Sequence, residues 1–206
     1  MLKVFFTQYS AFIVPPACPL SAYRREKLSS DNPELRKKQI INEFFLIKSL
    51  RSVNDELAMP LNIETNSYGK PYIPGYPYNF NLSHSDDLLI CGISDLELGV
   101  DAEKKVKPER VEKVAKRFFA EEEQDYIASA EDPSSAFTEI WTKKEAYVKA
   151  LGTGGSTPLN SFSVVSPIEG YSFSHSTAGD YHYTICVKAD TFPDDMRFEK
   201  ITFNAY

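Results

Sequence analysis

The chain has 206 residues, of which 23 are Lys or Arg and 29 are Asp or Glu, so its formal net charge is −6. This acidic balance argues against a nucleic-acid-binding protein, which would normally carry a basic surplus on one face. Hydrophobic residues make up 42% and charged residues 25% of the chain, as is typical of a globular protein with a core. The length fits one large domain or two small lobes.

The sequence predicts a cytoplasmic chain. No stretch approaches the roughly 18 apolar residues of a membrane span, and the N-terminal segment becomes polar too early for a signal peptide. The three cysteines, Cys18, Cys91 and Cys186, lie far apart and form no CxxC motif. They therefore indicate neither a disulfide framework nor a zinc site, and we expect each to be a small buried residue.

The first half of the chain begins with an expected strand at Leu2–Tyr9, where Val and Phe alternate loosely with polar residues. A helix is expected to begin at Asn32-Pro33, because Asn is a good N-cap and Pro is favoured at the first helical position. The stretch from Tyr68 to Tyr78, rich in Pro, Gly and Tyr, predicts a loop. The remaining expected elements are two antiparallel strands at 80–83 and 88–94, joined by a turn at 84–87, and a strand at 98–103.

The second half repeats this order of helices and strands. Pro108 predicts one helix start, and Asp132-Pro133 predicts another for a helix that ends at Gly152. Strands are expected at 162–165, 171–175, 181–187 and 198–203. The sequence therefore predicts an α+β fold of two lobes, 1–98 and 99–206, which pack directly on each other because no linker separates them.

Two acidic residues, Asp101 and Glu103, lie two positions apart in the strand expected at 98–103. Both carboxylates would project from one face, while Val100 and Ala102 point into the core. Adjacent carboxylates raise each other's pKa unless a cation lies between them, and Mg²⁺ prefers such oxygen ligands. A solvated strand edge explains the same spacing, so the pair alone leaves both interpretations open.

The helix expected after Asp132 carries Lys144 where its pattern predicts an apolar residue. Glu145 and Lys149 are four residues apart and share one edge of this helix. A solvated ion pair is the commoner explanation for such a pair, but a charge inside an apolar stripe often marks a functional site. The apolar stripe comprises Phe137, Ile140, Trp141, Val148 and Leu151.

Short polar residues gather in Asn81-Leu82-Ser83-His84-Ser85 at the end of an expected strand. Their side chains and nearby backbone N–H groups suit phosphate oxygens, although a turn held by local hydrogen bonds is an equally good interpretation. No GxSxG motif supports a nucleophilic serine here. Acids at the start of a helix, as in Glu121–Glu123, are favoured by the helix dipole without any function.

Five segments in this order resemble the 4′-phosphopantetheinyl transferases of the Sfp type. The resemblance implies a pseudo-twofold monomer of two similar α+β lobes, with coenzyme A and Mg²⁺ bound in the cleft between them. The segments are Gly69-Lys70-Pro71, Asn81-Leu82-Ser83-His84-Ser85, Gly99-Val100-Asp101-Ala102-Glu103, Arg117-Phe118-Phe119 with Glu123, and Trp141-Thr142-x-Lys144-Glu145-Ala146-x-x-Lys149.

The resemblance also implies roles for individual residues. Asp101, Glu103 and Glu145 would be the Mg²⁺ ligands. The catalytic residues would be Glu145, Lys144 and Glu123, and the general base would be Glu145, Glu123 or a water molecule. The residues that would bind the phosphates of coenzyme A are Lys27, Lys70, Ser83, His84, Lys144 and Lys149, with Arg24 and Arg25 as neighbouring candidates beside Lys27.

The implied reaction transfers 4′-phosphopantetheine from coenzyme A to a serine of an acyl or peptidyl carrier protein and releases adenosine 3′,5′-bisphosphate. The carrier would dock around residues 110–127. A Mg²⁺-dependent nucleotide or diphosphate phosphohydrolase is the main alternative, because the same carboxylates and lysines would serve it. A non-catalytic carrier-binding protein is a third interpretation, which the presence of the acids and Lys144 disfavours.

Overall fold

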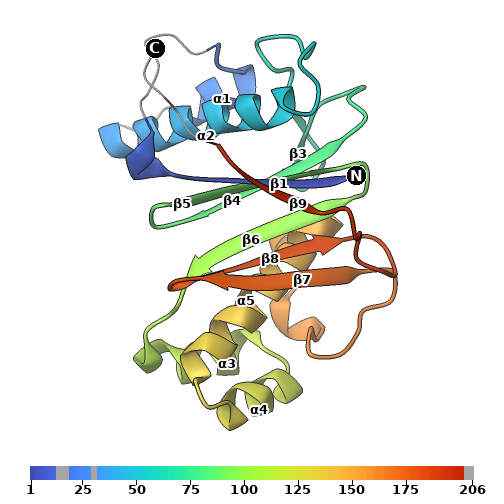
Figure 1. The fold of residues 1–206 in the computed structure, drawn as a ribbon. Coiled ribbons are helices and arrows are strands. Elements are labelled where there is room, and N and C mark those ends of the chain that lie inside the picture. Colours follow the sequence, from blue (N-terminus) through green and yellow to red (C-terminus); the bar gives the residue numbers. More distant parts are fainter. Residues whose placement is uncertain (13–18, 29–31, 202–206) are drawn as a thin grey trace.

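The computed structural model describes residues 1–12, 19–28 and 32–201. Its strands form a four-stranded sheet in the order β4-β5-β1-β9, a three-stranded sheet in the order β6-β8-β7, and the short pair β2-β3. Figure 1 shows α2 on the outer side of the first sheet and α5 against the second. The fold is α+β, as predicted.

The strands and helices have the following bounds. The strands are β1 (Leu2–Gln8), β2 (Glu64–Thr65), β3 (Pro71–Tyr72), β4 (Asn79–Ser85), β5 (Leu88–Ser94), β6 (Leu98–Lys104), β7 (Ser172–Ala178), β8 (Tyr181–Val187) and β9 (Arg197–Lys200). The helices are α1 (Ala22–Lys27), α2 (Pro33–Arg51), α3 (Pro108–Phe118), α4 (Glu121–Ser129) and α5 (Pro133–Leu151).

The core between the two sheets is apolar. Leu2 and Val4 of β1 pack with Val100 and Ala102 of β6, and all four side chains are fully buried. Because successive side chains of a strand point to opposite faces, Asp101 and Glu103 lie on the other face of β6, toward α5. The prediction that these two acids share one face, with their neighbours in the core, is confirmed.

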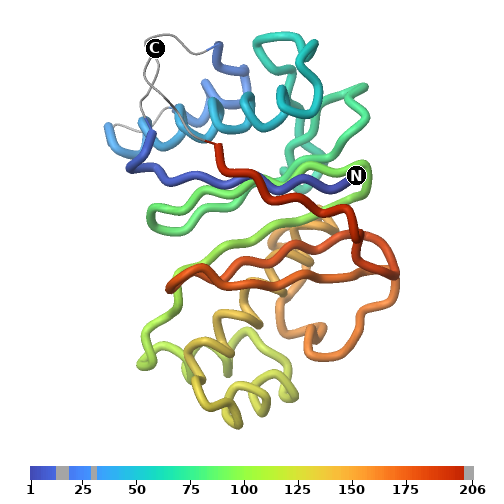
Figure 2. Tube along the Cα trace, in the orientation of Figure 1, coloured from blue at the N-terminus to red at the C-terminus, as the bar shows by residue number. Residues whose placement is uncertain are grey.

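The last described strand does not join the second sheet. β9 pairs in parallel with β1, with Lys3 opposite Arg197 and Phe6 opposite Lys200, and Figure 2 shows the chain crossing back to run beside its own N-terminal strand. A strand was expected close to this position, at 198–203. The division into lobes 1–98 and 99–206 stays a prediction, and the pairing of β9 assigns residues 197–200 to the sheet of the first lobe.

Both long helices begin at the residues that the sequence predicts, and α5 also ends where it predicts. The Asn32 side chain accepts hydrogen bonds from the backbone N–H groups of Glu34 and Leu35 at the start of α2, and the Asp132 side chain caps α5. α5 ends at Gly152, which has a φ of +70°, a left-handed conformation that favours glycine.

Two expectations about local structure are wrong or incomplete, and one helix was not predicted. Residues 162–165 form no strand, because the Phe162 carbonyl oxygen and the Val164 N–H bond to buried side chains of other segments. The predicted loop at 68–78 contains the two-residue strand β3. The helix α1 was not predicted, and its N-terminus is capped by the Ser21 side chain.

The described cysteines, Cys91 and Cys186, are free and buried, as expected, and Cys18 lies outside the described residues. Among the described helices, none is long and apolar enough to cross a membrane.

Gly99 lies where β6 passes close to the backbone of α5. A β carbon at this position would lie 2.0 Å from the Ala146 carbonyl oxygen and 2.4 Å from the Ala150 nitrogen, both backbone atoms. We therefore expect Gly99→Ala to lower the free energy of unfolding by about 3 kcal/mol, as measured by urea denaturation. The matched control is Gly155→Ala, whose added methyl group would meet nothing within 4 Å. Equal stability of the two variants would contradict the close approach of β6 to α5.

Candidate active site

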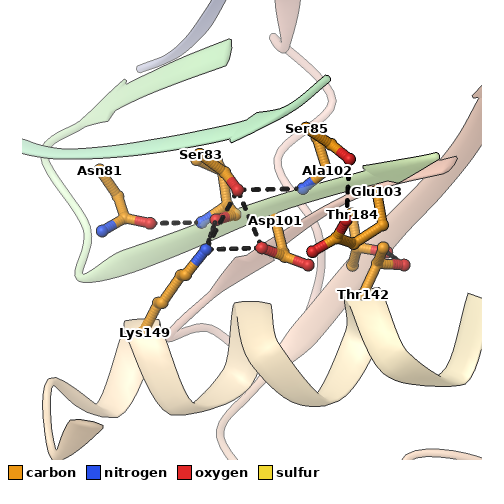
Figure 3. A network of polar contacts seen from close by, with 10 residues as sticks. Asn81, Ser83, Ser85, Asp101, Ala102, Glu103, Thr142, Lys149 and Thr184 are labelled. Atoms are coloured by element: carbon orange, nitrogen blue, oxygen red, sulfur yellow. Dashed lines mark hydrogen bonds and ion pairs between the residues drawn. The ribbon is translucent and has the colours of Figure 1, made fainter. Parts of the chain in front are cut away.

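Asp101 lies at the centre of a polar cluster where β4, β6 and α5 meet (Figure 3). Its side chain is 4% exposed. One oxygen, Oδ1, accepts hydrogen bonds from Lys149 Nζ at 2.6 Å and from Ser83 Oγ at 2.9 Å. The other oxygen, Oδ2, is buried and has no hydrogen-bond partner within the described part of the chain. A buried carboxylate oxygen without a partner is costly, so the site favours a bound cation.

Glu103 and Glu145 lie near this carboxylate. Burial raises the pKa of both glutamates, and the negative charge of Asp101 adds to the increase. The Ser85 hydroxyl, which donates to Glu103 Oε2 at 2.8 Å, partly offsets the shift for Glu103. The three acids therefore interact electrostatically, but in residues 1–12, 19–28 and 32–201 no three His, Cys, Asp or Glu side chains gather closely enough to hold a metal ion.

Lys149 links α5 to the strands of both sheets. Its ammonium group donates to Asp101 Oδ1, to Ser83 Oγ at 3.1 Å and to the Val100 carbonyl oxygen at 3.2 Å. The side chain is 28% exposed, so the group remains accessible from solvent. It is the only site lysine predicted from the sequence that contacts Asp101 in the described structure.

Lys144 and Glu123 form a separate ion pair inside the protein. Both side chains are 0% exposed, and Lys144 Nζ lies 2.6 Å from Glu123 Oε1. Lys144 also donates to the Phe162 carbonyl oxygen at 2.6 Å, and Glu123 accepts from the backbone N–H groups of Ala120 and Val164. Burial lowers the pKa of Lys144, against the effect of Glu123. Within the described residues, no hydrogen bond joins this pair to the Asp101 cluster.

Lys70 holds two parts of the backbone together. Its ammonium group donates to the Leu98 carbonyl oxygen at 3.0 Å and to the Ala150 carbonyl oxygen at 3.1 Å, and burial lowers its pKa. It thereby connects the segment before β3 to the start of β6 and to the last turn of α5. In this structure Lys70 therefore stabilises the fold through backbone carbonyl oxygens, whereas the resemblance implies that it binds phosphate.

A cavity of about 270 Å³ lies between α1, α2 and β4, and both Lys27 and His84 line it. Ser83 and His84 are neighbours on β4, so their side chains point to opposite faces, Ser83 to the Asp101 cluster and His84 to this cavity. Loss of water around the ring and the positive charges of Lys38 and Lys149 lower the pKa of His84. The other lining residues are Tyr23, Arg24, Gln39, Asn42, Leu46, Ile63, Pro71, Phe80, Asn81 and Leu82.

Of the basic residues on α1, Lys27 is the one that fits a ligand-binding role. Arg24 is 7% exposed, and its guanidinium bonds to Glu43 and Gln39. Arg25 donates to the Leu20 carbonyl oxygen. Among the described residues, Lys27 donates to the Tyr23 hydroxyl alone, at 2.6 Å, and an ammonium group has three N–H donors, so it can also bind a ligand.

A second cavity, of about 560 Å³, is bounded by α3, α5 and the segment after α5. Glu145 and Lys149 both line it. Lys149 therefore lies between this cavity and the Asp101 carboxylate. The other lining residues are Arg117, Phe118, Val148, Gly154, Gly155, Thr157, Pro158, Leu159 and Asn160.

The sequence did not predict that Asn81 and Ser85 contact β6. Asn81 Oδ1 accepts from the Val100 N–H at 2.8 Å, and Ser85 Oγ accepts from the Lys104 N–H at 3.0 Å. The signal was available in the polar residues at alternate positions 81, 83 and 85, which place three polar side chains on one face of a strand.

Comparisons with known proteins agree on one family. A family model described as the 4′-phosphopantetheinyl transferase superfamily matches residues 97–197. The chain is 38% identical over 120 residues to the 4′-phosphopantetheinyl transferase gsp of Aneurinibacillus migulanus. This match covers 57% of this chain and 48% of that protein. It is 33% identical over 168 residues to the 4′-phosphopantetheinyl transferase Sfp of Bacillus subtilis (strain 168). This match covers 73% of this chain and 74% of that protein.

A third relative is the 4′-phosphopantetheinyl transferase psf-1 of Bacillus pumilus, 37% identical over 116 residues, or 53% of this chain and 49% of that protein. The matches therefore span about half the length of gsp and psf-1 and about three quarters of Sfp.

Proposed function

Because the chain belongs to the 4′-phosphopantetheinyl transferase superfamily, we propose that it transfers 4′-phosphopantetheine from coenzyme A to a serine of an acyl or peptidyl carrier protein, with Mg²⁺ as cofactor. The serine oxygen would form a bond to the phosphorus that carries pantetheine. The bond from that phosphorus to the bridging oxygen would break and release adenosine 3′,5′-bisphosphate.

The observation that carries the Mg²⁺ assignment is the buried, unpartnered Oδ2 of Asp101. Glu103 and Glu145, whose pKa values are raised beside it, are the further proposed ligands. When bound, Mg²⁺ offsets the negative charge that develops on the diphosphate. Because these acids are not gathered closely enough to hold an ion by themselves, we propose that diphosphate oxygens and water complete the coordination shell.

Lys149 is the proposed cation for the diphosphate of coenzyme A. Its ammonium group is partly exposed and borders the cavity that Glu145 also lines. In that position it would stabilise the negative charge on the departing phosphate. Lys144, which is fully buried in its pair with Glu123, would act by holding α4 and α5 together.

Glu145 is the proposed general base for the serine proton, either directly, with the carboxylate oxygen that would not hold Mg²⁺, or through a water molecule. It lines the 560 Å³ cavity, from which a carrier serine would approach. Glu123 is less suitable for this role, because both of its oxygens accept hydrogen bonds from groups inside the protein.

The carrier is expected to dock on the surface around residues 110–127, next to this cavity. Arg117 and Phe118, at the C-terminal end of α3, both line its wall. A monomer is proposed because all groups of the site come from one chain, and the cytoplasm is proposed because the reaction uses coenzyme A.

The test is mass spectrometry of several carrier proteins incubated with the chain, coenzyme A and Mg²⁺, with and without EDTA. We expect the carrier to gain one phosphopantetheinyl group, and we expect EDTA to abolish the gain. Hydrolysis of coenzyme A with no mass gain on any carrier would favour the phosphohydrolase instead. Full transfer in EDTA would contradict the Mg²⁺ assignment.

Lys27→Ala and His84→Ala are expected to raise the KM for coenzyme A by about tenfold each, with a smaller change in kcat. Both side chains line the 270 Å³ cavity, which we propose binds the 3′-phosphate, and a charge-assisted hydrogen bond contributes roughly 1.5–3 kcal/mol. The matched control is Lys37→Ala, an exposed lysine on α2 outside the cavity lining. If dephospho-coenzyme A shows the same increase in KM as coenzyme A, the cavity does not bind the 3′-phosphate.

A further inference from the structure

Polar side chains from β4 bond to the backbone of β6 at three regularly spaced positions. The Val100 N–H donates to Asn81 Oδ1 at 2.8 Å, the Ala102 N–H to Ser83 Oγ at 3.2 Å, and the Lys104 N–H to Ser85 Oγ at 3.0 Å. Each pair is 19 residues apart, so the two strands run in the same direction in a fixed register.

This register occurs at the edges of two different sheets. β4 is the first strand of the four-stranded sheet and β6 the first strand of the three-stranded sheet. An edge strand has backbone N–H groups that its own sheet does not use. The side chains of β4 provide acceptors for three of these groups on β6, so they fix β6 relative to the first sheet.

The two serines also hold the two acids. Ser83 Oγ donates to Asp101 Oδ1 at 2.9 Å and Ser85 Oγ donates to Glu103 Oε2 at 2.8 Å, as Figure 3 shows. A hydroxyl has one proton to donate and can accept at the same time. Each serine therefore accepts from the β6 backbone and donates to the acid one residue earlier, which fixes the carboxylate against its own strand.

We infer that Ser85 is a positioning residue for Glu103, and that it affects metal binding only through that carboxylate. The inference rests on the proposed function, in which Glu103 is a Mg²⁺ ligand. Ser83 has the same relation to Asp101, but it also accepts from Lys149, so a substitution there would disturb two charged groups. Ser85 gives the cleaner test, because in the described structure its hydroxyl group bonds to Glu103 and to the Lys104 N–H, and to no second charged side chain.

The experiment compares Ser85→Val with Ser85→Thr. Both variants introduce a branched side chain that suits a strand. They differ at one position, where threonine keeps the hydroxyl group and valine has a methyl group. The measurement is Mn²⁺ binding, followed by electron paramagnetic resonance of the free ion, with saturating coenzyme A and no carrier protein. Substitution of a group that orients a metal ligand typically lowers metal affinity by about 10–100-fold. We therefore expect Ser85→Val to weaken Mn²⁺ binding about tenfold and Ser85→Thr to stay within about threefold of wild type.

Two further measurements separate positioning from a general structural effect. Thermal unfolding should be similar for the two variants, because the Lys104 N–H lies at an exposed position where water can replace the lost acceptor. In a Glu103→Gln background, Ser85→Val should cause no further loss of Mn²⁺ affinity. A further loss there, or equal affinities of wild type and both Ser85 variants, would overturn the inference.

The remaining outcomes are also decisive. Equal weakening by Ser85→Val and Ser85→Thr would show that the added methyl group matters and the hydroxyl does not, which overturns the inference alone. If the wild-type chain binds no Mn²⁺ under these conditions, the Mg²⁺ assignment fails, and the inference fails with it. Transfer to the carrier, measured separately by mass spectrometry, then tells whether the proposed reaction survives.

Discussion

Asp101→Asn should lower the rate of phosphopantetheinyl transfer at least about 100-fold, while the free energy of unfolding stays within about 1 kcal/mol of wild type. The substitution keeps the shape and the Oδ1 acceptor for Lys149 and Ser83, but it removes the negative charge that the proposed metal requires. Removing one group that stabilises the transition state electrostatically in a preorganised site typically costs a factor of about 10²–10³ in kcat. The rate is measured by mass spectrometry of the carrier and the stability by urea denaturation.

The matched control is Asp190→Asn, an exposed aspartate beyond the end of β8, which should leave both quantities unchanged. Glu145→Ala provides a second test of the same assignment, because Glu145 lies on a different element, α5, and is expected to be needed as well. Near-normal transfer in both Asp101→Asn and Glu145→Ala would contradict the metal site.

Elements whose limits depend on local sequence could be predicted. The N-cap Asp132 and the left-handed Gly152 mark both ends of α5, and each acts through its own neighbours in the chain. The failed strand at 162–165 depends on distant residues. Its backbone groups bond to Lys144, 18 residues before Phe162, and to Glu123, 41 residues before Val164. No local pattern contains that information.

The same distinction applies to the site. Alternation along a strand was sufficient to place Asp101 and Glu103 on one face, and helical spacing placed Lys144 in a buried stripe. Whether Lys144 or Lys149 would reach the acids could not be predicted, because that depends on how α5 is rotated against β6. Gly99, which has no side chain, lets α5 approach β6, and Lys149 is the lysine that contacts Asp101.

Lys144→Met is expected to lower the free energy of unfolding by about 3–5 kcal/mol. Lys144 and Glu123 are both fully buried, and removing one partner of a buried ion pair leaves the other charge without compensation. Methionine has a similar length and no charge, so little cavity is created. The measurement is urea denaturation, and the matched control is Lys143→Met. Lys143 is the neighbouring lysine, whose ion pair with Glu139 is partly exposed, and an exposed helical pair contributes only about 0.3–0.5 kcal/mol.

The double variant Lys144→Met/Glu123→Gln should recover part of the lost stability, because no buried charge remains and the glutamine oxygen can still accept from one of the two backbone N–H groups, those of Ala120 and Val164, that Glu123 binds. A double variant as unstable as Lys144→Met would contradict the ion-pair explanation. Its transfer rate then separates two roles for Lys144. Normal transfer by the stable double variant would limit Lys144 to holding α4 and α5 together, whereas a stable but inactive variant would require its ammonium group to reach the diphosphate during the reaction.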